Sequence, residues 1–115
     1  MLAENHLFII PVGAGLIFAI GGFVMLKFPP KNINGLYGYR TSSSMKSKER
    51  WDFAQLYSSK EMIKLGLLLA LSGVLGLIVT PKPEIGMIIG LGLMILVVIA
   101  LIVRVEKAIK KKFKS

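Results

Sequence analysis

The chain has 115 residues, a hydrophobic fraction of 54% and a net charge of +9, and its mean hydropathy is +0.68. A soluble domain of this length buries too small a fraction of its surface to hide so many apolar side chains, so the composition favours a membrane protein. With no cysteine and a single histidine, His6, the sequence excludes disulfides, thiolate metal sites and histidine-based catalytic pairs within one subunit.

The first expected element is a transmembrane helix over residues 7–27. Residues 7–26 are twenty consecutive positions without a charge, and about 20 helical residues cross a hydrocarbon core of about 30 Å. Pro11 lies one turn inside this helix, where proline is tolerated. A cleaved signal peptide is the alternative, but the run lacks a basic n-region and a small-residue cleavage site, so we expect a retained helix.

A polar segment follows over residues 28–61, much longer than the connections of about 4–6 residues that are usual in compact units. It opens with two prolines, which end the first helix, and continues with asparagines and glycines typical of turns. Because long connections of this kind are often functional, we expect this loop to be structured and to carry the site.

A short helix is expected within this loop over residues 48–60, with Ser47 as its N-cap. At about 100° per residue, one face combines Trp51 with polar and small residues, and the opposite face is aromatic and apolar. The two faces are Trp51, Ala54, Gln55, Ser58 and Met62, and Phe53, Leu56 and Tyr57. We expect the helix to pack on protein with one face and on the headgroup region with the other, an interfacial anchor without further role being the alternative.

Two further spans are expected over residues 62–80 and 84–103. The apolar part of the second begins at residue 65 and lengthens if Lys64 extends toward the headgroups. The prolines between the two spans stop one helix and start the next, which predicts an antiparallel hairpin. The expected fold is therefore an all-α integral membrane protein with three transmembrane helices plus a structured cytoplasmic loop with an interfacial helix.

The basic residues predict the orientation. Fourteen of the fifteen lysines and arginines lie in residues 27–64 and in the tail over residues 104–115. Three spans place both segments on one side of the membrane, and the positive-inside rule makes that side the cytoplasm, with the N-terminus outside. Apolar residues recur on one side of the basic tail, so we expect it to lie on the membrane against anionic headgroups. Nucleic acid is not an expected partner, because no base-stacking or groove-reading module is visible.

The loop carries a motif that resembles a known family. Residues 34–41 read Asn-Gly-Leu-Tyr-Gly-Tyr-Arg-Thr, residues 44–47 read Ser-Met-Lys-Ser, and Trp51 opens the next helix. This arrangement resembles the core signature of the SdpI family of bacterial membrane proteins, in which a Gly-x-Arg-Thr stretch precedes a tryptophan that opens a helix. The matching residues are Gly38, Arg40, Thr41 and Trp51.

The resemblance implies a location in the bacterial cell membrane and a role in immunity, since the family is named after the immunity protein of a sporulation-delaying toxin. The motif and binding candidates are Asn34, Gly38, Arg40, Thr41, Trp51 and Gln55. Family members often carry histidine or asparagine where this chain has Gln55, so a role that needs a titratable imidazole is not implied here. The best-known member has more spans, which implies that a three-span chain forms a homo-oligomer to build an equivalent unit.

Arg40 has two interpretations on physical grounds. Its planar guanidinium could hold a lipid phosphate, or it could act as a structural staple that bonds helix-end carbonyls or Asp52. The glycines of the spans, including the pair Gly86 and Gly90, favour packing within the bundle over a dimer seam. The spans carry no central charge, which argues against an ion-coupled transporter.

We expect no enzyme and no cofactor, because the acidic residues are scattered and no phosphate-loop, dinucleotide or zinc motif occurs. The expected function is protection of the host from a membrane-active toxic peptide, with that peptide and membrane lipids as partners. The protein would bind the peptide within the bilayer or change lipid access through the basic loop. Two other classes stay open: a signalling or scaffold protein that captures a cytoplasmic regulator, and a lipid or small-molecule transporter subunit.

Overall fold

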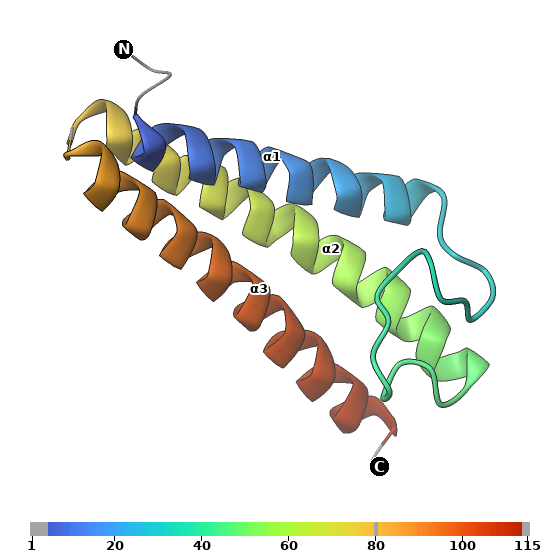
Figure 1. Cartoon of the computed structure of the whole chain (residues 1–115). Helices are drawn as coiled ribbons and strands as arrows, with labels where there is room; N and C mark the ends of the chain where they lie inside the picture. The colour runs from blue at the N-terminus through green and yellow to red at the C-terminus, as the bar shows by residue number, and fades with distance from the viewer. Residues whose placement is uncertain (1–4, 80, 114–115) are drawn as a thin grey trace.

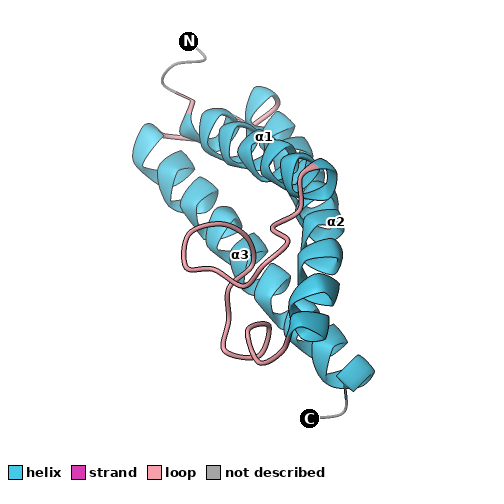
Figure 2. Ribbon diagram, turned by 90° about the vertical axis from the view of Figure 1, so that its right-hand side faces the viewer, coloured by secondary structure: helices cyan, strands magenta, loops and turns pink. Residues whose placement is uncertain are grey.

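The computed structural model of the chain describes residues 5–79 and 81–113. These residues form α1 (His6–Lys27), α2 (Lys48–Gly73), the short 3₁₀ turn η2 (Val74–Leu77) and α3 (Pro83–Phe113). Figure 1 shows α1 and α2 lying side by side, with α3 crossing beside them. The loop between α1 and α2 folds back at the end of the bundle where α3 finishes, as the turned view shows (Figure 2). The all-α prediction is therefore confirmed.

Two of these helices, α1 and α3, are long and apolar enough to cross a membrane. Helix α2 does not meet the same measure, because Lys60, Glu61 and Lys64 interrupt its apolar half. The predicted second span over residues 62–80 is also not one α-helix: α2 ends at Gly73 and the chain tightens into η2. Thr80 lies outside the described residues.

The predicted short helix over residues 48–60 does not stand alone, because α2 runs from Lys48 to Gly73 without a break. Its start is as predicted: the Ser47 side chain accepts a hydrogen bond from the backbone N–H of Arg50 at 3.2 Å. Since the segment contains no proline and no glycine before Gly66, nothing in the sequence ends the helix between the polar and the apolar half. One helix therefore joins the loop to the apolar residues that follow Lys64.

The basic tail also differs from the prediction of an extension lying on the membrane. Helix α3 continues through it to Phe113. Val105 and Ile109 are fully buried in a core cluster with Leu101, Ala54 and Tyr39. The apolar side of the tail thus packs on protein, because α2 and the loop supply a closer apolar surface than the headgroups do.

Glycines set the distance between the helices. A Cβ added at Gly66 of α2 would lie 2.6 Å from the carbonyl oxygen of Gly15 and the amide nitrogen of Ala19 in α1. Gly90 of α3 likewise faces the carbonyl oxygen of His6, which a Cβ would approach to 3.1 Å. At these glycines the helix backbones lie in direct contact and gain dispersion energy. Larger side chains would hold the helices apart and lose that energy. Gly86 and Gly90 are therefore used within the bundle, as the sequence favoured.

Candidate functional site

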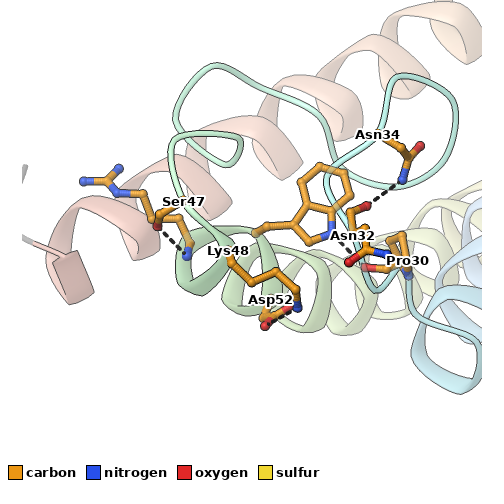
Figure 3. A network of polar contacts seen from close by, with 8 residues as sticks. Pro30, Asn32, Asn34, Ser47, Lys48 and Asp52 are labelled. Atoms are coloured by element: carbon orange, nitrogen blue, oxygen red, sulfur yellow. Dashed lines mark hydrogen bonds and ion pairs between the residues drawn. The ribbon is translucent and has the colours of Figure 1, made fainter.

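The loop before α2 is shaped first by its own short-range hydrogen bonds. The side-chain oxygen of Asn34 accepts from the amides of Leu36 and Tyr37, at 2.9 and 2.7 Å. Its side-chain nitrogen donates to the carbonyl of Asn32 at 2.9 Å, as Figure 3 shows. Asparagine suits this position because its short amide replaces the backbone partner that a turn lacks. Asn34 therefore fixes an exposed turn.

Gly38 and Gln55 form the buried contact between the loop and α2. The side-chain amide of Gln55 accepts from the backbone N–H of Tyr39 and donates to its carbonyl, both at 2.7 Å. Gly38 has a φ of +107°, and a Cβ there would lie 2.5 Å from the Gln55 side-chain oxygen. Glycine is thus required by both the backbone conformation and the close approach. A carboxamide is well suited at position 55, because it has both an acceptor for the N–H of Tyr39 and a donor for the carbonyl of the same residue.

Trp51 anchors the beginning of the loop. Its indole N–H donates to the carbonyl of Pro30 at 2.7 Å, and its side chain is fully buried. An indole buries a large apolar area but requires a partner for its single donor. On the exposed side of α2, Lys48 and Asp52 form an ion pair (Figure 3).

Tyr39 and Thr41 tie the loop to α3 through one carboxylate. Both hydroxyls donate to the same oxygen of Glu106, at 2.6 Å from Tyr39 and 2.9 Å from Thr41. Burial, reinforced by the negative charge of Glu106, raises the pKa of Tyr39 well above its ordinary range. The phenol therefore stays neutral and keeps its donor proton at physiological pH. We call Gly38, Tyr39, Thr41, Gln55 and Glu106 the loop network.

A second carboxylate, Glu61, joins α2 to α3. It is buried and accepts from the Arg104 guanidinium and, at 3.3 Å, from the ammonium of Lys64. Burial alone would raise the pKa of Glu61, but the hydrogen bonds from Arg104 and Lys64 outweigh it, so the pKa lies below its ordinary value. The carboxylate is thus held ionised between two cations at the loop end of the bundle.

Arg40 lies at the outer surface of the loop. Its guanidinium donates to the carbonyl of Gly35, which favours the staple interpretation, although the partner is a loop carbonyl and not a helix end. Asp52, the other proposed partner, is paired with Lys48. Arg40 is exposed, so its charge faces away from the helices.

The structure therefore brings Gly38, Thr41, Trp51 and Gln55 together at the buried side of the loop and leaves Asn34 and Arg40 on its outside. The sequence analysis missed Tyr39, Glu61 and Glu106 as members of the polar contacts. One signal for Glu106 existed, since it is the single acidic residue of a basic tail. Glu61 stands next to the apolar run of α2, where an unpaired carboxylate would be costly.

The geometry defines an all-α protein with two helices long and apolar enough to cross a membrane and a long loop that buried polar contacts fasten to α2 and α3. The chain belongs to the SdpI/YfhL protein family, whose family model matches residues 31–105. That range holds all six candidate residues of the motif. The chain is 47% identical over 64 residues to YfhL of Bacillus subtilis (strain 168), an uncharacterized protein; the alignment covers 56% of this chain and 57% of that relative. No solved structure matches the chain.

Proposed function

We propose that this family member crosses the bacterial cell membrane three times, with its N-terminus outside and its C-terminus in the cytoplasm. The second crossing in chain order comprises the apolar part of α2, η2 and the two residues after it, and runs from Leu65 to Val79. The contacts of Glu106 with Tyr39 and of Arg104 with Glu61 hold the two basic segments at one end of the bundle. That common position supports the orientation that the positive-inside rule predicts.

Reporter fusions test this orientation. A fluorescent protein fused after Ser115 is expected to be bright, and a periplasmic phosphatase at the same place inactive. A phosphatase fused within the short connection after Val79 is expected to be active. Activity of the phosphatase after Ser115 would reverse the proposed orientation.

We propose further that the protein protects its host from a membrane-active toxic peptide, acting by binding and not by catalysis. The observation that carries this proposal is the family match over residues 31–105, which include most of the loop and all of α2. The resemblance implies immunity, because the SdpI family is named after an immunity protein. The loop network supports it physically. Its hydrogen bonds hold the loop in one conformation, and a loop with a fixed conformation can serve as a preformed binding surface.

Two mechanisms fit this function. Exposed apolar side chains along α1 and α3, such as Ile17, Ile20 and Ile88, offer a surface on which a peptide could bind within the bilayer. Alternatively, the basic loop end could change the access of the peptide to anionic lipid. A homo-oligomer would enlarge either surface.

A matched pair of glycine variants tests the immunity proposal. The chain would be produced in a peptide-sensitive bacterium that is challenged with membrane-active peptides, and the inhibitory concentration is expected to rise at least several-fold for one of them. Gly38→Val strains the loop and clashes with Gln55, so it should abolish that protection. Gly35→Ala should preserve it, since no described residue comes within 4 Å of a Cβ there. Unchanged sensitivity to every peptide with the wild-type chain would contradict the proposal.

A scaffold protein is the second candidate, and one observation favours it. Leu36 at the loop surface is 94% exposed, and the partly exposed Tyr37 and the cationic Arg40 lie near it in the chain. An exposed leucine beside a fixed cation is a plausible anchor for a cytoplasmic regulator. Leu36→Ser would abolish capture of such a regulator while leaving protection from a peptide unchanged.

A further inference from the structure

An open groove of about 480 Å³ lies between α2 and α3 at the loop end of the bundle. Two aromatic residues of α2 and five residues of α3 line it, and four of these five are cationic. The lining residues are Phe53, Tyr57, Arg104, Lys107, Ala108, Lys111 and Lys112. None of the described residues that line the groove is acidic, so it combines an apolar wall with a strongly positive one.

The cations of α3 are gathered on the groove side. Arg104, Lys107 and Lys111 are three and four residues apart, the spacing that places side chains on one face of a helix. Lys110, which is exposed, does not line the groove. Three of the cations thus form a row along the groove wall, next to the buried side of α3 that carries Val105 and Ile109.

The aromatic wall is held in place by ring contacts. Phe53 stacks on Tyr57 with ring centroids 5.6 Å apart, and Phe113 meets Phe53 edge-on at 5.8 Å. The ammonium of Lys112 lies 5.1 Å from the centroid of Phe53, within the range of a cation–π contact. These contacts reduce the freedom of the groove wall before any ligand binds, which lowers the entropic cost of binding.

The groove begins where the apolar run of α3 ends. Arg104 is the first charged residue after the uncharged residues 85–103. From Arg104 to Lys111 the helix rises about 10 Å, and the headgroup layer on each side of a bilayer is about 5–8 Å thick. A helix that crosses the membrane therefore carries the groove from the edge of the hydrocarbon core through the headgroup layer.

We propose that this groove binds an anionic phospholipid. The phosphate would lie between Arg104, Lys107 and Lys111, and the glycerol and the first acyl carbons would lie against Phe53 and Tyr57. Arg104 can serve both partners, because its Nε donates to Glu61 and its terminal nitrogens donate to no described residue. Basic pockets between membrane helices bind anionic headgroups in this manner. The inference goes beyond toxin immunity, because it requires only that α3 crosses the membrane.

The test compares two double variants with the same net charge. The full chain is purified in detergent micelles, and binding of phosphatidylglycerol and phosphatidylcholine is measured by native mass spectrometry. Lys107→Gln with Lys111→Gln removes two cations from the groove. Lys60→Gln with Lys110→Gln removes two exposed cations from the same helices outside it. All four lysines are exposed, so both variants keep the fold.

The wild-type chain is expected to bind phosphatidylglycerol at least roughly tenfold more tightly than phosphatidylcholine. About 1 kcal/mol for each basic residue near the surface corresponds to a roughly fivefold change in affinity. The groove variant should therefore lose about tenfold or more, and the control variant about twofold or less. Tyr57→Ser should weaken phosphatidylglycerol binding further in the groove variant.

Three results would overturn the inference. Equal losses in the two double variants would mean that the tail attracts anions by its general charge. Equal binding of the two lipids would mean that the negative charge is not recognised. Displacement of phosphatidylglycerol by an equal concentration of inorganic phosphate would assign the groove to free phosphate and not to a lipid.

Discussion

The interface of α1 with the apolar part of α2 and the loop end of the bundle are held together by opposite means. Along α1 and α2, backbones touch at Gly15, Gly66 and Gly73, and a Cβ at any of these positions would clash. At the loop end, hydrogen bonds among Tyr39, Thr41, Gln55 and Glu106 fasten the loop to α2 and α3. The α1–α2 interface therefore has no room for side chains larger than hydrogen at its glycines. The loop end instead requires side chains that can donate or accept particular hydrogen bonds.

This difference follows from the solvent that the proposed membrane topology gives each region. Lipid competes poorly for close packing but offers no hydrogen-bond partners, so small residues and van der Waals contact hold helices together there. At the membrane boundary water competes for every polar group, and a loop keeps its shape only if its backbone groups find better-placed partners than water. Each region should therefore fail under a different kind of substitution.

The largest effect is expected from enlarging a glycine in the helix interface. Gly66→Leu places atoms where the backbone of α1 now lies, so α1 and α2 must separate. We expect a loss of about 3 kcal/mol or more, at the upper end for overpacking, because backbone cannot move aside as a side chain can. Thermal unfolding of the purified chain in detergent micelles measures it.

Gly92→Leu is the matched control for this substitution. Gly92 lies in the apolar part of α3, and no described residue comes within 4 Å of a Cβ there. Its unfolding temperature should be unchanged or slightly raised, since glycine is a poor helix former. If both leucine variants lost stability equally, glycine packing would not be what holds α1 against α2.

The next effect concerns Gln55 in the loop network. Gln55→Leu leaves the buried N–H of Tyr39 without a partner, at a cost of about 1–3 kcal/mol. The Tyr39 carbonyl loses its 2.7 Å bond from Gln55 and keeps the 3.2 Å bond from the Ser44 hydroxyl. Gln55→Glu keeps an acceptor for the Tyr39 N–H but places a buried carboxylate against the Tyr39 carbonyl, so it should also lower stability, and this loss should shrink at low pH as the carboxyl is protonated. Hydrogen exchange of the Tyr39 amide should accelerate strongly in the first variant and weakly in the second. Exchange at wild-type rate in Gln55→Leu would contradict the role of the amide.

The sequence predicted the helices and turns better than the contacts between distant segments. Apolar runs and prolines located α1, α3 and the turn before α3, because these signals are local in the chain. The unbroken α2 was missed, since charge at Lys60, Glu61 and Lys64 was taken as a boundary although no residue there breaks a helix. The burial of Glu61 became understandable only with Arg104, which lies 43 residues away in the chain.

The candidate site shows the same limit. Gly38, Trp51 and Gln55 could be selected from the loop motif, because their spacing resembles a family signature. The role of Glu106 depends on where α3 passes the loop, and its two partners lie 67 and 65 residues away in the chain. Periodicity locates faces of helices, but pairing between distant segments requires the packing angle of α3, which no short pattern contains.

A smaller effect with a defined pH dependence is expected at Glu61. Its pKa is lower in the folded chain than its ordinary value of 4.5, so the ionised carboxylate contributes stability that is complete above about pH 4.5. That contribution is lost as the pH falls through the lowered pKa. Glu61→Gln should reduce the free energy of unfolding by about 1–2 kcal/mol at pH 7, as expected for hydrogen bonds to a charged partner.

The difference between wild type and Glu61→Gln should therefore shrink as the pH is lowered from about 5 to 3. Denaturant unfolding in micelles at several pH values measures it. A difference that stays constant over this range would mean that folding does not lower the pKa of the Glu61 carboxyl. A difference that grows would reverse the sign of the proposed pKa shift.

The smallest effect is expected at the exposed pair of Lys48 and Asp52. Their charged atoms are 2.7 Å apart, but each side chain is 54% exposed, and exposed pairs four residues apart contribute only about 0.3–0.5 kcal/mol. The order of lysine before aspartate is also the less favourable one on a helix. Asp52→Asn should therefore change the free energy of unfolding by less than about 0.5 kcal/mol, and added salt should remove even that. Loss of more than about 1 kcal/mol would mean that general charge attraction holds the loop end, and the contrast between a packed interface and a hydrogen-bonded one would then be wrong.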